Sequence, residues 1–393
     1  MSNTSGESLA SDQSDFDAII VGSSPILLLE ALYLSSQGER VAIFESKDRL
    51  GGAWYTKPLW GMSSVEVGCH YIDKGTHNYA FLEKFLGIEL KPTPRHTRLN
   101  IDSERRAAMR QAPLTAKRKI RNFLESLLAN KLIVVDRWNF HSSVTKQKIK
   151  PIIQSCVRLL RAKPYMYPVQ GCLEMLNALN AKIEASGIPV FSSTSVDSVE
   201  IDDDGSRATC CVGDRVYRSE SVITGQNLNL DVSVNGEPLS IEKDLYGGPE
   251  NLDEGYVHVV FQVVGEKKHP FAYIDLHHAN GVRRVQDVTP FSKFDPSDVE
   301  FQLLICCHIL KEGFDTFGEP ARILEHLVTL DLLKPGARML EYYVDAYPTV
   351  GCIPNEQLAQ LEKTLPKALK IMRTFDLGIS LEHYCNRWRS LVA

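Results

Sequence analysis

Residues 17–46 read DAIIVGSSPILLLEALYLSSQGERVAIFES, and this stretch decides the fold. Its first five residues form an apolar run rich in β-branched side chains, which suits a buried parallel strand. Gly22 follows where the chain must turn, and Pro25 stands where a helix would begin, since its missing N–H costs nothing there. Gly38 is a natural stop for that helix, and RVAIFE then predicts a second strand that ends in Glu45.

Strand, glycine turn, helix, strand and terminal acid make up a βαβ unit of the dinucleotide-binding type. The free N–H groups at the start of such a helix suit a pyrophosphate, and the acid suits a ribose diol. In the pattern G-x-G-x-x-G, however, only Gly22 matches, because Ser24 and Leu27 stand at the second and third glycine positions. The unit alone therefore leaves two interpretations open, a nucleotide site or a plain βαβ unit.

The next residues, FESKDRLGGAWYT (44–56), narrow this choice. Residues 16–72 resemble the N-terminus of the superfamily of FAD-dependent amine oxidases, protoporphyrinogen oxidases and phytoene desaturases. The matching positions are Glu45, Lys47, Arg49, Gly51, Gly52 and Thr56. Ala53 stands where many members carry an arginine.

The resemblance implies a fold, a cofactor and a set of contacts. The fold would be α/β (α+β overall), a Rossmann-like FAD-binding domain with a discontinuous second domain for substrate. FAD would be the cofactor and no metal is expected, while the catalytic residues stay unknown. The expected cofactor-binding residues are Gly22, Ser23, Ser24, Glu45, Lys47, Arg49, Gly51, Gly52 and Val196.

Two later segments agree with this resemblance. Residues 167–201 predict an amphipathic helix that Gly187 ends, and they resemble the family's P-x-G-G helix and the strand whose Val196 would contact adenine. Residues 217–226 resemble the strand that returns to the nucleotide sheet. We therefore expect a disordered tail (1–15), an FAD-binding domain (16–84, 165–232 and about 341–393) and a substrate-binding domain (85–164 and 233–340).

Several residues are candidates for the substrate site. His70, in VEVGCHYI (65–72), would lie near the flavin edge according to the resemblance, or else it is a structural histidine. The resemblance also implies a substrate cage from the tyrosines of EYYVDAYPTVGCIP (341–354), with ordinary strand packing as the alternative: Tyr342, Tyr343 and Tyr347.

The cysteine content and the hydrophobic pattern limit what can be expected about disulfides, metal binding and location. Nine scattered cysteines without a C-x-x-C pair indicate reduced thiols, and CCH at 306–308 lies in an apolar run that favours burial over metal binding. No export signal and no membrane-spanning run is found, so a cytoplasmic location, with peripheral membrane association as an option, is expected.

Residues 91–163 are strongly basic, with 18 Lys or Arg against four Asp or Glu. This suits an anionic substrate, a membrane surface or an acidic partner; the alternative is a set of solvated helix faces. Nucleic acid is not expected, since few aromatic residues accompany the charge.

One family motif is missing. Members usually end with a Gly-Asp pair before a last helix, and here the only Gly-Asp is Gly213-Asp214, in a predicted hairpin. The main hypothesis is an FAD-dependent oxidoreductase that oxidises or desaturates a small substrate, anionic or membrane-delivered, by hydride transfer to flavin. The alternatives are a redox-neutral flavin-dependent sugar mutase and a flavin-free binding or escort protein like the GDP-dissociation inhibitors.

Overall fold

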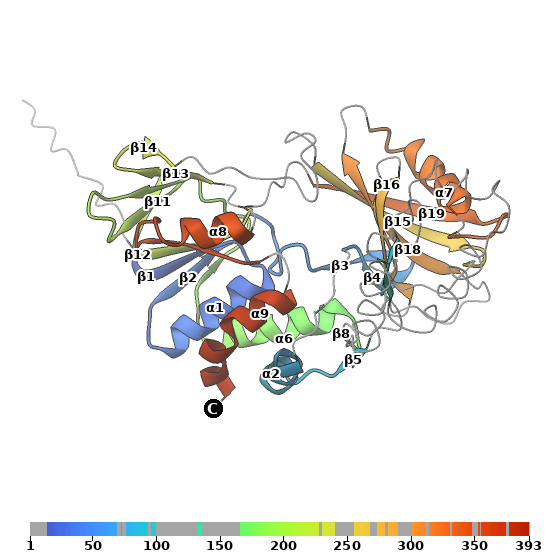
Figure 1. Ribbon diagram of the computed structural model, residues 1–393. Coiled ribbons are helices and arrows are strands. Elements are labelled where there is room, and N and C mark those ends of the chain that lie inside the picture. The colour runs from blue at the N-terminus through green and yellow to red at the C-terminus, as the bar shows by residue number, and fades with distance from the viewer. Residues whose placement is uncertain are drawn as a thin grey trace, which may run out of the picture.

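The computed structural model builds the chain from two large sheets (Figure 1). It describes residues 14–68, 72, 76–92, 96–99, 133–135, 166–227, 230–239, 255–267, 273–279, 282–289, 301–310, 314–330, 332–347, 353, 355–374 and 377–392.

The first sheet has nine strands and contains the βαβ unit. Its order is β14-β13-β10-β11-β12-β1-β2-β9, with β20 also paired to β12. The strands β2, β1, β12 and β20 run parallel, as expected for a nucleotide-binding sheet. Their bounds are β1 (Ser14–Val21), β2 (Val41–Phe44), β9 (Val190–Phe191), β10 (Ser198–Ile201), β11 (Ala208–Val212), β12 (Arg215–Gly225), β13 (Asp231–Val234), β14 (Glu237–Pro238) and β20 (Leu369–Met372).

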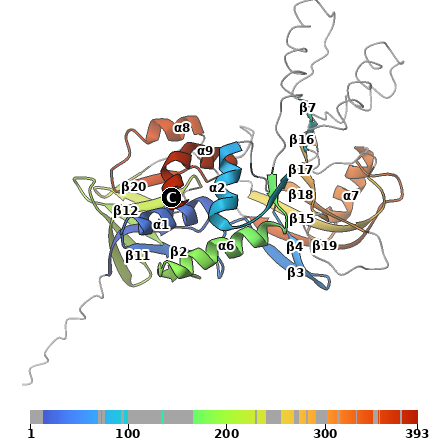
Figure 2. The ribbon, with the colours of Figure 1, turned by 90° about the horizontal axis from the view of Figure 1, so that it is seen from below.

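Alternating residues of β1 face two different hydrophobic cores. Ala18 and Ile20 pack with α1 (Pro25–Ser36), α6 (Cys172–Ala185), α2 (Thr76–Leu86) and α9 (Leu377–Trp388). Ile19 packs on the other side with β10, β11 and α8 (Asn355–Leu361). Figure 2 shows α1, α2, α6 and α9 gathered together, with the 3₁₀ turn η3 (Arg389–Val392) ending the described chain.

The second sheet has seven strands in the order β19-β15-β18-β17-β16-β6-β7. One face packs against α7 (Glu319–Thr329) through Phe261 and Leu304. The opposite face carries Val260 and Ile305, which belong to the same core as α1 and α6. This inner face is therefore directed toward the nucleotide-binding half. The bounds are β6 (His96–Leu99), β7 (Ile133–Val135), β15 (Gly255–Val264), β16 (Tyr273–Ala279), β17 (Val282–Asp287), β18 (Gln302–Leu310) and β19 (Arg338–Tyr347).

Two small antiparallel sheets of two strands each complete the architecture. The hairpin of β3 (Thr56–Leu59) and β4 (Met62–Glu66) lies between the large sheets in both views. The strands β5 (Leu90–Pro92) and β8 (Met166–Pro168) pair antiparallel. Among the described residues no helix is long and apolar enough to cross a bilayer.

The predicted fold class is confirmed, with local corrections. The helix after the glycine turn ends at Ser36, and β12 returns beside β1 as expected. Gly213 lies in the β11–β12 hairpin, also as expected. Three predicted domain borders differ from the structure, because strand pairing extends beyond them. β1 begins at Ser14, inside the predicted tail (1–15). β13 extends past residue 232 and pairs in the nine-stranded sheet, and β19 pairs in the seven-stranded sheet up to Tyr347 instead of ending near residue 340.

Candidate functional site

The first turn of the βαβ unit is held by the side chain of Ser23. Its hydroxyl donates to Oε2 of Glu45 at 2.5 Å and accepts from the backbone N–H of Gly51 at 3.0 Å. Ser23 is 1% exposed and Glu45 5% exposed. One buried hydroxyl therefore joins the three segments to which the sequence assigns the cofactor: the turn, the end of β2 and the glycine doublet.

The second oxygen of Glu45 is also occupied. Oε1 accepts from the backbone N–H of Lys47 at 2.8 Å and from the hydroxyl of Ser46 at 3.3 Å. A carboxylate offers about four acceptor positions, so one position on Oε2 is left for a ribose hydroxyl. Lys47 contributes its backbone here, and its side chain is exposed.

The start of α1 is capped by the chain itself. Ser24 is the N-cap, and its hydroxyl accepts from the backbone N–H of Leu27 at 3.5 Å. Pro25, at the next position, has no N–H to offer. The side chain of Leu27 packs against Gly22, whose φ of +95° favours glycine. The helix thus offers an anion fewer free donors than a glycine-rich turn would, although a 3.5 Å bond is long and can be exchanged.

The glycine doublet packs tightly between α1 and α6. A Cβ on Gly51 would lie 2.7 Å from Leu176, and a Cβ on Gly52 would lie 3.3 Å from Cα of Ser24. Arg49 donates to the carbonyl of Gly52 at 3.0 Å, and its guanidinium lies 3.5 Å from the ring centroid of Tyr55. Arg49 therefore orders this loop.

The segment predicted to contact adenine lies beside Glu45. The backbone N–H of Ser193 donates to the carbonyl of Lys47 at 2.8 Å, and that of Thr194 to the carbonyl of Glu45 at 2.9 Å. Val196 follows two residues later and is buried in the core on the far side of β1. The described cofactor candidates thus gather at one edge of the nine-stranded sheet.

A strand and a helix are present in the region where the Gly-Asp motif was expected. β20 runs parallel to β12 and leads into α9, which contacts α1. Gly225, at the end of β12, approaches Thr374 so closely that a Cβ would lie 2.8 Å from its hydroxyl oxygen. A strand and a helix therefore lie where the resemblance predicts the Gly-Asp pair and the last helix, without that pair in their sequence.

These contacts fit an FAD whose adenosine end is held differently from the family pattern. The lack of side chains at Gly51 and Gly52 lets the doublet loop lie directly against Leu176 of α6 and Ser24 at the start of α1. Glu45 would hold the ribose with its one open acceptor position, while Ser23 and Lys47 fix its orientation.

The tyrosine candidates separate by strand parity. Tyr343 lies on the inner face of the seven-stranded sheet, where Lys57 of β3 donates to its hydroxyl. Tyr342 points to the other face and packs near α7, so it cannot belong to the same cage. The backbone of Tyr347 pairs with Tyr256, but its side chain lies outside the described residues, as does His70.

The sequence reasoning missed three buried polar groups. Glu30 of α1 accepts from Lys370 at 2.6 Å, from Arg387 at 2.8 Å and from the indole of Trp388 at 3.3 Å. Glu30 is the one charged residue in the apolar run 26–34, and this could have indicated a buried carboxylate.

The second group is Glu66 of β4, which accepts from the Tyr167 hydroxyl at 2.6 Å and from the backbone N–H of Cys172 at 2.7 Å. Burial raises the pKa of the Glu66 carboxyl, although both hydrogen bonds lower it. Burial, with Glu66 nearby, also raises the pKa of the Cys172 thiol. The third group is Gln286 of β17, which is fully buried.

The cysteine run is partly described. Cys306 is buried in the core next to α7, as expected. The side chains of Cys307 and His308 lie outside the described residues. Among the described residues, no group of three His, Cys, Asp or Glu could hold a metal ion.

Comparison with known proteins agrees with the resemblance seen in the sequence. Residues 28–151 match the family model described as flavin containing amine oxidoreductase. The matched stretch covers about a third of the chain, and this part is similar to the FAD-dependent amine oxidase superfamily. This match confirms the predicted superfamily, its cofactor FAD and the class of FAD-dependent oxidoreductase. A search of the curated proteins finds no match.

Solved structures show the same fold over nearly the whole chain. Putrescine oxidase with bound putrescine is 15% identical, with a TM-score of 0.56 and coverage of 96% of this chain and 98% of that one. Reduced UDP-galactopyranose mutase is 13% identical, with a TM-score of 0.59 and coverage of 96% and 93%. A putative protoporphyrinogen oxidase from Exiguobacterium is 9% identical, with a TM-score of 0.57 and coverage of 97% and 98%.

Proposed function

We propose that this protein oxidises a small substrate, an amine or a compound with an activated C–H bond, by hydride transfer to FAD. The observation that carries the proposal is the buried Ser23 hydroxyl, which links Glu45 to Gly51 and so joins the turn, the acid and the doublet. A plain βαβ unit would not need a buried carboxylate at this point, because an unpaired charge is costly to bury.

The bound FAD supplies the hydride acceptor, and the protein supplies position and electrostatics. Glu45 orients the ribose, while Gly51 and Gly52 let the doublet loop pack against α6 and the start of α1. Arg49 holds the doublet loop through the carbonyl of Gly52. Tyr343 and Lys57 lie on the inner face of the second sheet, directed toward the nucleotide-binding half, and so suit contacts with substrate.

The substrate class needs evidence besides the fold. An amine oxidase and a sugar mutase of this fold match the chain about equally well, with TM-scores of 0.56 and 0.59. Shared architecture does not fix the reaction. The family description favours amine oxidation. An acidic or membrane partner would rest on the basic segment 91–163, most of which lies outside the described residues.

The test begins with flavin content. We expect the purified protein, supplied with FAD, to show the visible absorbance of oxidised flavin and to lose it under anaerobic conditions with a suitable amine. Bleaching by amines but not by nucleotide sugars supports the oxidase, whereas turnover of a nucleotide sugar with the flavin recovered unchanged supports the mutase. A protein that stays colourless in excess FAD would instead support the flavin-free binding protein.

A matched pair of variants then tests the cofactor site. Glu45→Ala should weaken FAD binding about ten- to a hundredfold, because it removes a hydrogen bond to a charged acceptor. Ser46→Ala removes a longer bond to the same carboxylate and should change the Kd less than threefold. Equal FAD affinity in wild type and Glu45→Ala, measured by titration of the apoprotein, would refute the role of Glu45.

A further inference from the structure

The start of α1 retains few donors for a diphosphate. Four N–H groups at the start of a helix have no partner within it, those of the N-cap and of the next three residues. In α1, Pro25 has no N–H, and the N–H of Leu27 donates to the Ser24 hydroxyl at 3.5 Å. The N–H groups of Ser24 and Ile26 remain, so the helix offers an anion about half of the usual donors.

Glu45, the acid expected to bind the ribose, is nearly saturated by bonds within the chain. Its carboxylate is 5% exposed. Three of its about four acceptor positions take hydrogen bonds from Ser23, Ser46 and Lys47. The adenosine ribose has two neighbouring hydroxyls, so Glu45 can bind one of them without giving up an internal bond.

Ser24 also joins the helix start to the glycine doublet. A Cβ on Gly52 would lie 3.3 Å from Cα and 3.6 Å from Cβ of Ser24, so the two segments are in direct contact. Arg49, the cation of the doublet loop, donates to the carbonyl of Gly52 and packs on the ring of Tyr55. The segments to which the resemblance assigns the diphosphate are therefore packed against and bonded to each other.

The same contacts satisfy the turn when no cofactor is bound. The Ser23 hydroxyl donates to Glu45 and accepts from the N–H of Gly51, so neither buried group depends on FAD for a partner. A site whose buried carboxylate had no partner in the chain would lose stability with its cofactor. That penalty is absent here, so release of FAD should leave the fold intact.

We propose that FAD is an exchangeable cofactor of this protein, so that occupancy of the site follows the supply of free FAD. Ser24 determines the affinity, because its side chain stands at the second glycine position and takes the N–H of Leu27. Each bond to a charged group that the cofactor gives up weakens binding about ten- to a hundredfold. This inference rests on the proposed function, since it concerns the cofactor of that same reaction.

Dialysis of the native protein tests the exchange. The wild type, loaded with FAD, should lose its flavin absorbance during dialysis at neutral pH and recover it when FAD is added back, with no denaturant at any step. Circular dichroism should show the same fold in the FAD-free and FAD-loaded protein, because the turn is bonded within the chain.

Substitution of Ser24 tests which residue sets the affinity. Ser24→Gly removes the side chain and frees the N–H of Leu27, so FAD should bind about tenfold more tightly than it does to the wild type. Glycine is nearly as good an N-cap as serine, so this variant should fold. Ser24→Ala lacks the hydroxyl but keeps a Cβ, and its Kd should lie between those of the wild type and Ser24→Gly.

A matched control and a second ligand sharpen this test. Ser36→Gly makes the same change at the other end of α1, where the hydroxyl donates to the carbonyl of Tyr33, and should change the Kd less than about twofold. ADP carries the ribose and a diphosphate but no flavin. Calorimetric titration of the FAD-free protein with ADP should therefore show the same tightening in Ser24→Gly as FAD does.

The outcomes separate this inference from the proposed function. If the wild type keeps FAD through dialysis, or if Ser24→Gly binds FAD and ADP no more tightly, the inference is wrong, while bleaching by amines still supports the oxidase. If FAD exchanges and Ser24→Gly binds it more tightly but no amine bleaches the flavin, the inference stands and the oxidase proposal fails. If neither the wild type nor the variants bind FAD or ADP, both fail.

Discussion

The two sheets differ in how their buried polar groups are bonded. Around the nine-stranded sheet, Glu30, Glu45 and Glu66 all accept hydrogen bonds from within the chain. On the inner face of the seven-stranded sheet, Gln286 has no such bond. Polar groups that are fully bonded fix a scaffold, and one that is not bonded suits an external partner. The difference separates a half whose buried carboxylates are bonded within the chain from a face that carries an unbonded amide.

The largest effect is expected from breaking the most strongly bonded group. Glu30→Ala leaves Lys370 and Arg387 without their carboxylate and removes the link from α1 to β20 and α9. The loss should be about 3 kcal/mol in the free energy of unfolding, the low end for a broken buried ion pair. The low end applies because the cations are 34% and 31% exposed and can be hydrated. Urea unfolding measures this change.

Glu184→Ala, an exposed glutamate on α6, is the control and should change the free energy by less than about 0.5 kcal/mol. Similar losses in the two variants would show that the Glu30 cluster does not fix the scaffold. The bonded carboxylates around the nine-stranded sheet would then not be what stabilises that half of the molecule.

The sequence predicts the βαβ unit because its signals are local. Gly22, Pro25 and Gly38 act on their own neighbours, and the apolar runs between them have strand and helix lengths. Strand parity could also have separated Tyr342 from Tyr343, since adjacent residues of a strand point to opposite faces.

The bonding of the buried polar groups could not be predicted in this way. Glu30 and its partner Lys370 are 340 residues apart in the sequence, and Lys57 and Tyr343 are 286 residues apart. The face on which Gln286 lies is known only from its register with Ile305. Such contacts depend on how two sheets from distant segments meet, and no local pattern encodes that.

A smaller effect is expected from the pH dependence of Glu66. Its folded pKa is raised above the ordinary value of 4.5, mainly by burial, so the folded state holds this proton to a higher pH than the unfolded chain does. The stability that this carboxyl contributes is therefore complete below pH 4.5 and is lost as the pH rises through the folded pKa.

Glu66→Gln should remove that slope. Its amide oxygen can accept from Cys172 N–H, and its amide nitrogen can donate to the Tyr167 hydroxyl. The free energy of unfolding of wild type should fall relative to the variant as the pH rises above 4.5, as measured by urea unfolding at each pH. Parallel curves would show that the pKa of the Glu66 carboxyl is the same in the folded and unfolded states, so that ionising it in the folded protein costs no stability.

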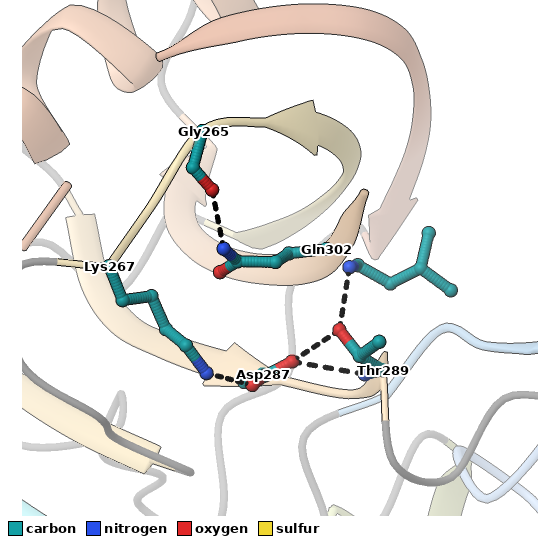
Figure 3. A network of polar contacts seen from close by, with 6 residues as sticks. Gly265, Lys267, Asp287, Thr289 and Gln302 are labelled. Carbon is teal, nitrogen blue, oxygen red and sulfur yellow. Dashed lines mark hydrogen bonds and ion pairs between the residues drawn. The ribbon is translucent and has the colours of Figure 1, made fainter. Parts of the chain in front are cut away.

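The smallest effect is expected at Gln286, the buried amide of the seven-stranded sheet that has no hydrogen-bond partner. Gln286→Leu replaces an amide that has no partner with an apolar group of similar size, so the Tm of the ligand-free protein should stay the same or rise by a few degrees. Gln302→Leu removes a bond from Nε2 to the carbonyl of Gly265 (Figure 3) and should lower the Tm, by an amount typical of one hydrogen bond. Both residues lie in the same sheet and undergo the same chemical change; they differ in that Gln302 makes one hydrogen bond, from Nε2, and Gln286 makes none. A fall in Tm for Gln286→Leu as large as that for Gln302→Leu would mean that Gln286 is bonded within the protein, and the inner face would then resemble the scaffold of the other sheet.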